Sequence, residues 1–167
     1  MKAPGLSEIK RELGGQSAAR LQELCLRLAR YRLENKELLG YLLYEAQDEQ
    51  GYIRAVKAEM EEQFGQMNVQ NIYYAKKSVR KVLRMVNKYI RFSGRKETEV
   101  ELFLFFCRCL YESGLLSRKS SAIKSLYVRQ LQKAGTALKG LHEDLQYDYG
   151  EAVKALTLPQ GENGNNH

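Results

Sequence analysis

The fold is decided by one short stretch near the middle of the chain, residues 98–110, which reads TEVELFLFFCRCL. Within it, apolar side chains fall on every side of an α-helix, and a helix that is apolar all round has to be buried. The segment is therefore predicted to be the central helix of the domain. Thr98 and Glu101 fit a capping box, which places the start of this helix at Thr98. Ser113 and Gly114 then end it.

Outward from this stretch, apolar residues recur at helical spacing along nearly the whole chain, and no segment alternates as a strand does. Cap and stop signals divide this pattern into helical segments near residues 6–13, 17–31, 38–46, 48–64, 69–92, 98–112 and 120–145. The sequence thus predicts a single all-α domain over residues 1–158, followed by a flexible polar tail, 159–167. It predicts about six to seven helices, arranged as a bundle or as stacked antiparallel pairs in a short solenoid.

Composition excludes several classes of protein. The chain has 167 residues, two prolines, three cysteines and two histidines, which fits neither a disulfide framework nor a clustered metal site. Its longest apolar run is far shorter than the ~20 residues of a membrane-spanning helix. We therefore expect a soluble, cytoplasmic protein with reduced thiols, no metal and no cofactor.

The formal net charge of +7 is concentrated in one segment. Residues 69–96 contain nine Lys and Arg and no Asp or Glu, whereas residues 1–68 and 97–167 each carry a net charge of −1. A second run rich in basic residues begins at Arg118 and ends at Lys139. The chain is thus a nearly neutral protein with one strongly basic helix, residues 69–92.

On that helix the cations share one arc, and the apolar residues lie on another. Tyr73 projects into the middle of the basic arc, where its ring could stack on a base. We call the following eight residues the basic face and take them as the candidate binding site for an anionic partner: Tyr73, Lys76, Lys77, Arg80, Lys81, Arg84, Lys88 and Arg91.

Two interpretations of the basic face compete. In the first, its cations contact nucleic-acid phosphates. In the second, the protein is an interaction module or homo-oligomer whose basic face meets an acidic protein surface. Neutralisation inside the chain is a third outcome, for which the sequence offers two acidic groups, Glu97, Glu99 and Glu101 or Glu59, Glu61 and Glu62.

An enzymatic function has little support in the sequence, because phosphate-binding glycine loops and nucleophile motifs are absent. The carboxylates Glu45, Asp48 and Glu49 cluster at a predicted helix junction, where capping and solvation explain them. We therefore predict a non-enzymatic binding or scaffold protein without catalytic residues.

The N-terminal segments EIKREL (8–13), LQEL (21–24) and NKELL (35–39), with AKK at 75–77, resemble small all-helical bacterial proteins of unknown function. That resemblance implies helices throughout and no established activity.

Overall fold

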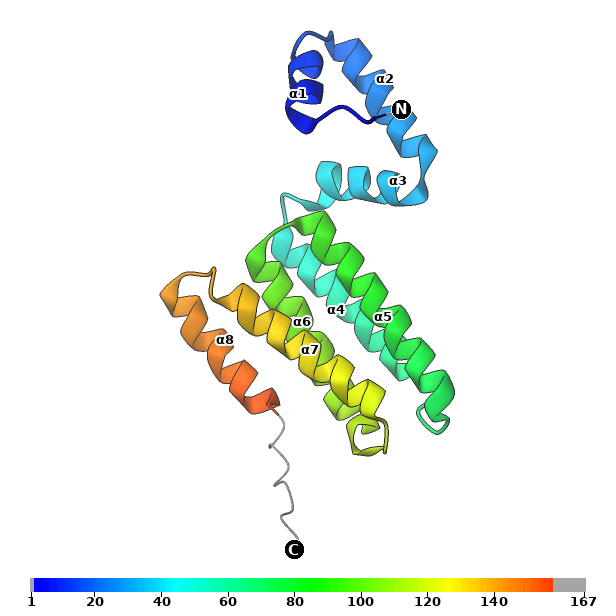
Figure 1. The fold of residues 1–167 in the computed structure, drawn as a ribbon, viewed down its shortest axis with the longest axis vertical. Helices are drawn as coiled ribbons and strands as arrows, with labels where there is room; N and C mark the ends of the chain where they lie inside the picture. The colour runs from blue at the N-terminus through cyan, green and yellow to red at the C-terminus, as the bar shows by residue number, and fades with distance from the viewer. Residues whose placement is uncertain (1, 158–167) are drawn as a thin grey trace, which may run out of the picture. The chain divides into compact units, whose positions relative to one another are not determined.

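A computed structural model describes residues 2–157, and within that range every long element is an α-helix and no strand occurs (Figure 1). The all-α prediction is confirmed, with eight α-helices in residues 2–157 where the sequence predicts about six to seven. The helices are α1 (Leu6–Gly14), α2 (Ala18–Tyr31), α3 (Leu33–Gly40), α4 (Glu49–Gly65), α5 (Ile72–Ser93), α6 (Lys96–Glu112), α7 (Ser121–Leu138) and α8 (Glu143–Leu156). A short π-helical turn, Tyr41–Glu45, and a 3₁₀ turn, Leu115–Ser117, complete the elements.

The chain divides into two compact units, residues 1–45 and 46–167, which are described separately. The prediction of a single domain over residues 1–158 stays a prediction. The predicted flexible tail, 159–167, lies outside the described residues.

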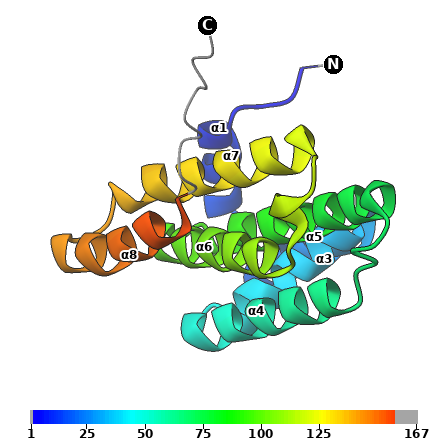
Figure 2. The ribbon, with the colours of Figure 1, turned by 90° about the horizontal axis from the view of Figure 1, so that it is seen from below.

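In the second unit, α6 is the central helix, as residues 98–110 predicted. It packs against α4, α5, α7 and α8, and Figure 2 shows it between α4 and α7. Phe106, near the middle of α6, is fully buried and meets the ring of Phe64 edge to face at 5.8 Å between centroids. Ten residues of α6 are buried, which explains why apolar side chains lie on most sides of this helix.

The additional helix comes from residues 120–145, which were predicted as one segment. The structure ends α7 at Leu138 and begins α8 at Glu143. Gly140, in the turn between them, lowers the helix propensity at this point. The heptad-like series from Tyr127 to Leu145 is therefore split, and α8 folds back onto α6 and α7.

Most predicted helix starts agree with the structure. Ser17, Asp48 and Ser120 each accept a hydrogen bond from a backbone N–H in the first turn of α2, α4 and α7. The predicted cap of the basic helix, Asn68, is wrong by one turn. Asn71 caps α5 by accepting from the N–H groups of Tyr73 and Tyr74, so the helix spans residues 72–93 and not 69–92.

The predicted capping box at Thr98 is also wrong, because the Thr98 hydroxyl forms a tertiary hydrogen bond. The helix starts at Lys96, and Thr98 Oγ1 donates to Glu49 Oε1 at 2.5 Å. Ser93 Oγ donates to the same oxygen, and Arg95 Nε lies 3.5 Å from Glu49 Oε2. Glu49 is only 10% exposed and thereby joins the start of α4 to the end of α5 and the start of α6.

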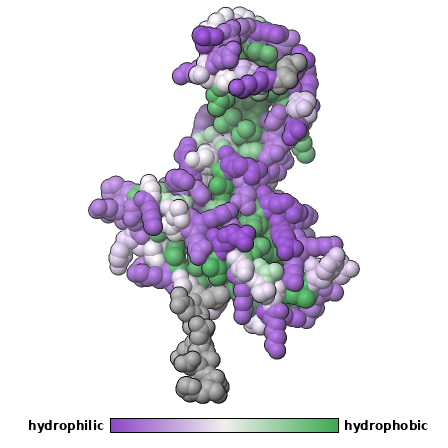
Figure 3. All heavy atoms as spheres, viewed as in Figure 1, coloured by the Kyte–Doolittle hydropathy of each residue, from purple (hydrophilic) through white to green (hydrophobic). Residues whose placement is uncertain are grey.

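The first unit has no comparable core. Among residues 2–45, Tyr41 alone is buried, and many leucines of α2, α3 and the following turn are exposed. Leu28, Leu33 and Leu42 have more than half of their surface in solvent. Figure 3 shows hydrophobic side chains at the surface of this first unit.

Candidate anion-binding surface

One side of α5 is anchored in the core of the second unit. Ala75, Val79, Val82 and Val86 are buried, which confirms the apolar arc predicted from the sequence. Because these residues fix the rotation of the helix about its axis, the basic arc is turned outward.

The structure brings the residues of the basic face together on one helix and exposes most of them. Tyr73, Lys77, Arg80, Lys81, Arg84 and Arg91 are exposed, whereas Lys76 and Lys88 are half-buried. The five cations from Lys76 to Arg84 extend over about 12 Å of helix axis at the usual rise of ~1.5 Å per residue. That length corresponds to about three to four phosphates along one strand of a duplex.

No acid in the described part of the chain forms an ion pair with these five cations. Several of them are like-charged neighbours one turn apart, such as Lys77 and Lys81, an arrangement that destabilises a helix unless another charge compensates. Their charge is thus available to an external anion.

Four of the six acids that the sequence offered for neutralisation have other partners. Glu99 pairs with Lys96 at 2.9 Å, and Glu101 pairs with Lys57 at 2.6 Å. Glu59 accepts from the Tyr89 hydroxyl at 3.0 Å, and Glu62 accepts from Gln66 at 3.1 Å. None of the six acids forms an ion pair with a cation between Lys76 and Arg84.

Two exposed tyrosines stand at the N-terminal end of the basic face. Tyr73 and Tyr74 are 58% and 55% exposed, and their rings meet edge to face at 5.4 Å between centroids. Lys77 Nζ lies 4.5 Å from the centroid of the Tyr73 ring. This contact holds a cation beside an aromatic surface, which is the combination that single-stranded nucleic acids bind.

The second basic run approaches the same end of α5, which sequence reasoning did not anticipate. Arg118 Nη2 donates to Gln70 Oε1 at 3.4 Å, although the two residues are 48 positions apart. In Figure 1, α5 and α7 begin at the same end of the second unit. No local pattern could have revealed this proximity, because it depends on the path that the chain takes through α5 and α6 between the two residues.

The alternative sites are less well formed. Asp48 is used as a cap, Glu49 is satisfied by its contacts with Ser93, Thr98 and Arg95, and Glu45 is exposed. In residues 2–157 no group of three or more His, Cys, Asp or Glu could hold a metal ion. No helix there is both long and apolar enough to cross a membrane.

Comparisons with known proteins give no match to a family, to a curated relative or to a solved structure.

Proposed function

We propose that this protein is a non-enzymatic helical binding protein whose basic face contacts the phosphates of a nucleic acid. In this proposal Lys77, Arg80, Lys81 and Arg84 neutralise phosphate charge, and Tyr73 offers a ring for stacking. Affinity comes mainly from counterion release, so binding tolerates many sequences and weakens steeply as salt rises.

The observation that carries the proposal is a row of five cations, Lys76 to Arg84, without an internal counter-charge among residues 2–157. A face that only solvates a helix usually mixes both signs, because like charges one turn apart repel. Here the repulsion persists in the folded protein, and an anionic polymer relieves it along the whole row.

Fluorescence polarisation with short labelled oligonucleotides, single- and double-stranded, DNA and RNA, tests the proposal. We expect binding at low salt that weakens as salt is raised. The triple variant Lys77→Glu/Lys81→Glu/Arg84→Glu should lose at least about tenfold in affinity, and the slope of log K against log salt should fall by about one per lost contact. Each of these side chains is exposed, so the fold should persist by circular dichroism.

A matched control carries the same change in charge elsewhere: Lys10→Glu/Arg27→Glu/Arg30→Glu, three exposed cations in the first unit. If this control loses as much affinity as the α5 variant, only the total charge matters and the basic face is not the site. Absence of binding to every oligonucleotide at low salt would also contradict the proposal. Such a result, together with a dimer in light scattering, would favour an acidic protein surface or a second copy as the partner.

A further inference from the structure

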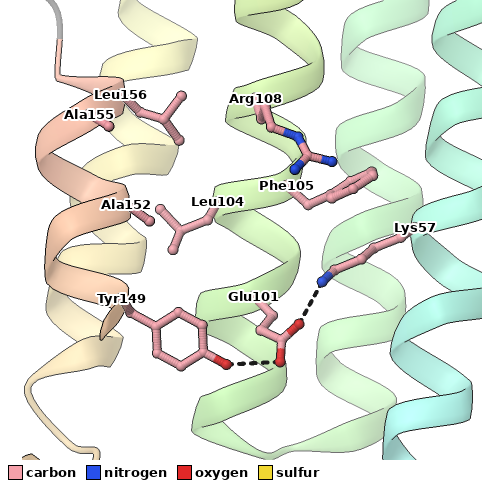
Figure 4. A pocket seen from close by; sticks show the side chains of 9 residues that line it. All are labelled: Lys57, Glu101, Leu104, Phe105, Arg108, Tyr149, Ala152, Ala155 and Leu156. Carbon is pink, nitrogen blue, oxygen red and sulfur yellow. Dashed lines mark hydrogen bonds and ion pairs between the residues drawn. The ribbon is translucent and has the colours of Figure 1, made fainter. Parts of the chain in front are cut away.

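A groove of about 390 Å³ lies in the second unit between α6 and α8, with α4 at its edge (Figure 4). Its wall is apolar and comes from Leu104 and Phe105 of α6 and from Ala152, Ala155 and Leu156 of α8. The volume falls within the range of small-molecule sites, about 300–1,000 Å³.

The groove exists because α8 presents a small residue where it faces α6. Tyr149, Ala152 and Leu156 follow a three- and four-residue spacing, so they share one side of α8. Tyr149 and Leu156 are held at the two ends: the Tyr149 hydroxyl donates to Glu101 at 2.8 Å, and the Leu156 carbonyl accepts from Tyr127 at 2.5 Å. Ala152 between them leaves the middle of the interface unfilled.

One end of the groove is electrically neutral. Glu101 Oε2 accepts from Lys57 at 2.6 Å, and Glu101 Oε1 accepts from Tyr149, as Figure 4 shows. Burial, followed by the hydrogen bond to Glu101, raises the pKa of Tyr149 well above its ordinary value, so the hydroxyl keeps its proton. Glu101 and Lys57 therefore cancel each other and leave no net charge at this end.

Arg108 supplies the one remaining charge of the lining. Its guanidinium lies 4.5 Å from the centroid of the Phe105 ring, while Lys57 Nζ lies 5.4 Å from the same centroid. Its acidic neighbour, Glu112, is 3.8 Å away, which is too long for a hydrogen bond, and both side chains are more than half exposed. The guanidinium can thus pair with a carboxylate through two parallel hydrogen bonds.

We propose that this groove binds a small amphipathic carboxylate, a medium-chain fatty acid or an acid of similar shape. Its carboxylate would pair with Arg108, and its apolar chain would lie in the hollow over Ala152. The net charge of +1 in the lining matches one carboxylate. If each non-hydrogen atom takes up ~30 Å³, the volume of one water molecule in the liquid, the groove holds about a dozen such atoms. That number accommodates octanoate.

NMR titration of the full chain with octanoate tests this inference, with octylamine and acetate as ligands that share only the tail or only the head. We expect octanoate to bind with a Kd of about 1 mM and to shift the methyl signals of Leu104 and Ala152. Octylamine and acetate should bind at least about tenfold more weakly, because each lacks one half of the recognition.

Two variants locate the site by independent means. Arg108→Gln should weaken octanoate binding about tenfold by removing the charged pair, and Ala152→Leu should abolish it by filling the hollow. Arg129→Gln, which removes an exposed cation of α7 outside the groove, is the matched control and should bind as the unaltered protein does. The triple α5 variant should also keep octanoate binding, so this inference and the proposed function can fail separately.

Equal binding of octanoate and octylamine would overturn the inference, since the interaction would then be merely hydrophobic. It would also be overturned by unchanged affinity in both Arg108→Gln and Ala152→Leu, or by shifts confined to the basic face.

Discussion

In residues 46–157, α6 buries ten side chains among four other helices, whereas among residues 2–45 only Tyr41 is buried. Both regions nevertheless consist of helices with apolar residues at the same spacing. In α2 these are Leu21, Leu24 and Leu28, and none of them is buried.

The difference teaches that periodicity orients apolar side chains without guaranteeing that anything covers them. A helix is enclosed only when enough neighbours surround it, and a segment of 45 residues has little volume for a closed core. The second unit has a closed core because four helices surround α6. The predictions below test this contrast.

The largest effect is expected from separating the two units. Residues 46–167 expressed alone should remain helical and unfold cooperatively, because their core lies within that segment. Residues 1–45 alone should show little helix, because short helices without a core are marginal in water. Circular dichroism during urea titration measures the helix content and the cooperativity of unfolding of each fragment. A cooperative transition in the 1–45 fragment would remove the contrast.

A single truncation in each unit sharpens the comparison. Phe106→Ala removes a fully buried ring and should lower the free energy of unfolding by about 3–5 kcal/mol. Leu28→Ala, at a side chain that is 61% exposed, should change it by about 0.5 kcal/mol or less. Urea denaturation of both variants measures the two changes in the free energy of unfolding. Similar losses would mean that Leu28 is as well covered as Phe106.

The same contrast applies to carboxylates. Glu49→Ala should lower the free energy of unfolding by about 2–3 kcal/mol, because it leaves the hydroxyls of Ser93 and Thr98 without their acceptor and Arg95 without its acidic partner. Glu23→Ala in α2 removes an exposed pair with Arg20 and should cost about 0–0.5 kcal/mol. Thermal unfolding should separate the two variants clearly. If Glu49→Ala proves neutral, the carboxylate does not join the three helices.

The smallest effect concerns the cysteines. Cys25 is exposed, whereas burial raises the pKa of Cys107 to about 12 and that of Cys109 to about 11, from 9.0. A thiol reagent near pH 8 should therefore label one cysteine in the native chain and three in urea. Rapid native labelling of Cys107 or Cys109 would show that the core opens.

The same two thiols give stability a pH dependence of defined sign. Between about pH 9 and pH 11–12 the unfolded chain has lost thiol protons that the folded chain still holds. Stability should thus be unaffected by these thiols below about pH 9 and should fall as the pH rises through that window. Replacing Cys109 with Ala should make the decline less steep, as measured by urea midpoints across the range.

Local signals were sufficient for most elements and insufficient for a few particular ones. Ser17, Asp48 and Ser120 cap helices because a cap needs only a side chain and the next turn of backbone. Thr98 has the same side-chain signal for a helix cap, yet its hydroxyl donates a hydrogen bond to Glu49, which lies 49 positions away. The split at Gly140 was missed for a related reason, since the series of leucines continues across the turn.

Of the two proposed binding surfaces, only the basic face was visible in the sequence, because all its residues lie on one helix with a regular spacing. The groove was not, since Arg108, Lys57 and Ala152 belong to three helices and have no shared pattern. The best signal would have been Ala152, a small residue on the same side of α8 as Tyr149 and Leu156.

The sequence by itself determined that the chain is helical, that residues 98–110 are central and that the charge lies on one helix. These properties depend on side chains a few positions apart, whose relation is set by helix geometry. Only the tertiary structure decided that the nearby acids turn to Lys57, Lys96 and Tyr89, and that a hollow remains under α8. Such contacts join residues distant in the chain, and packing alone brings them together.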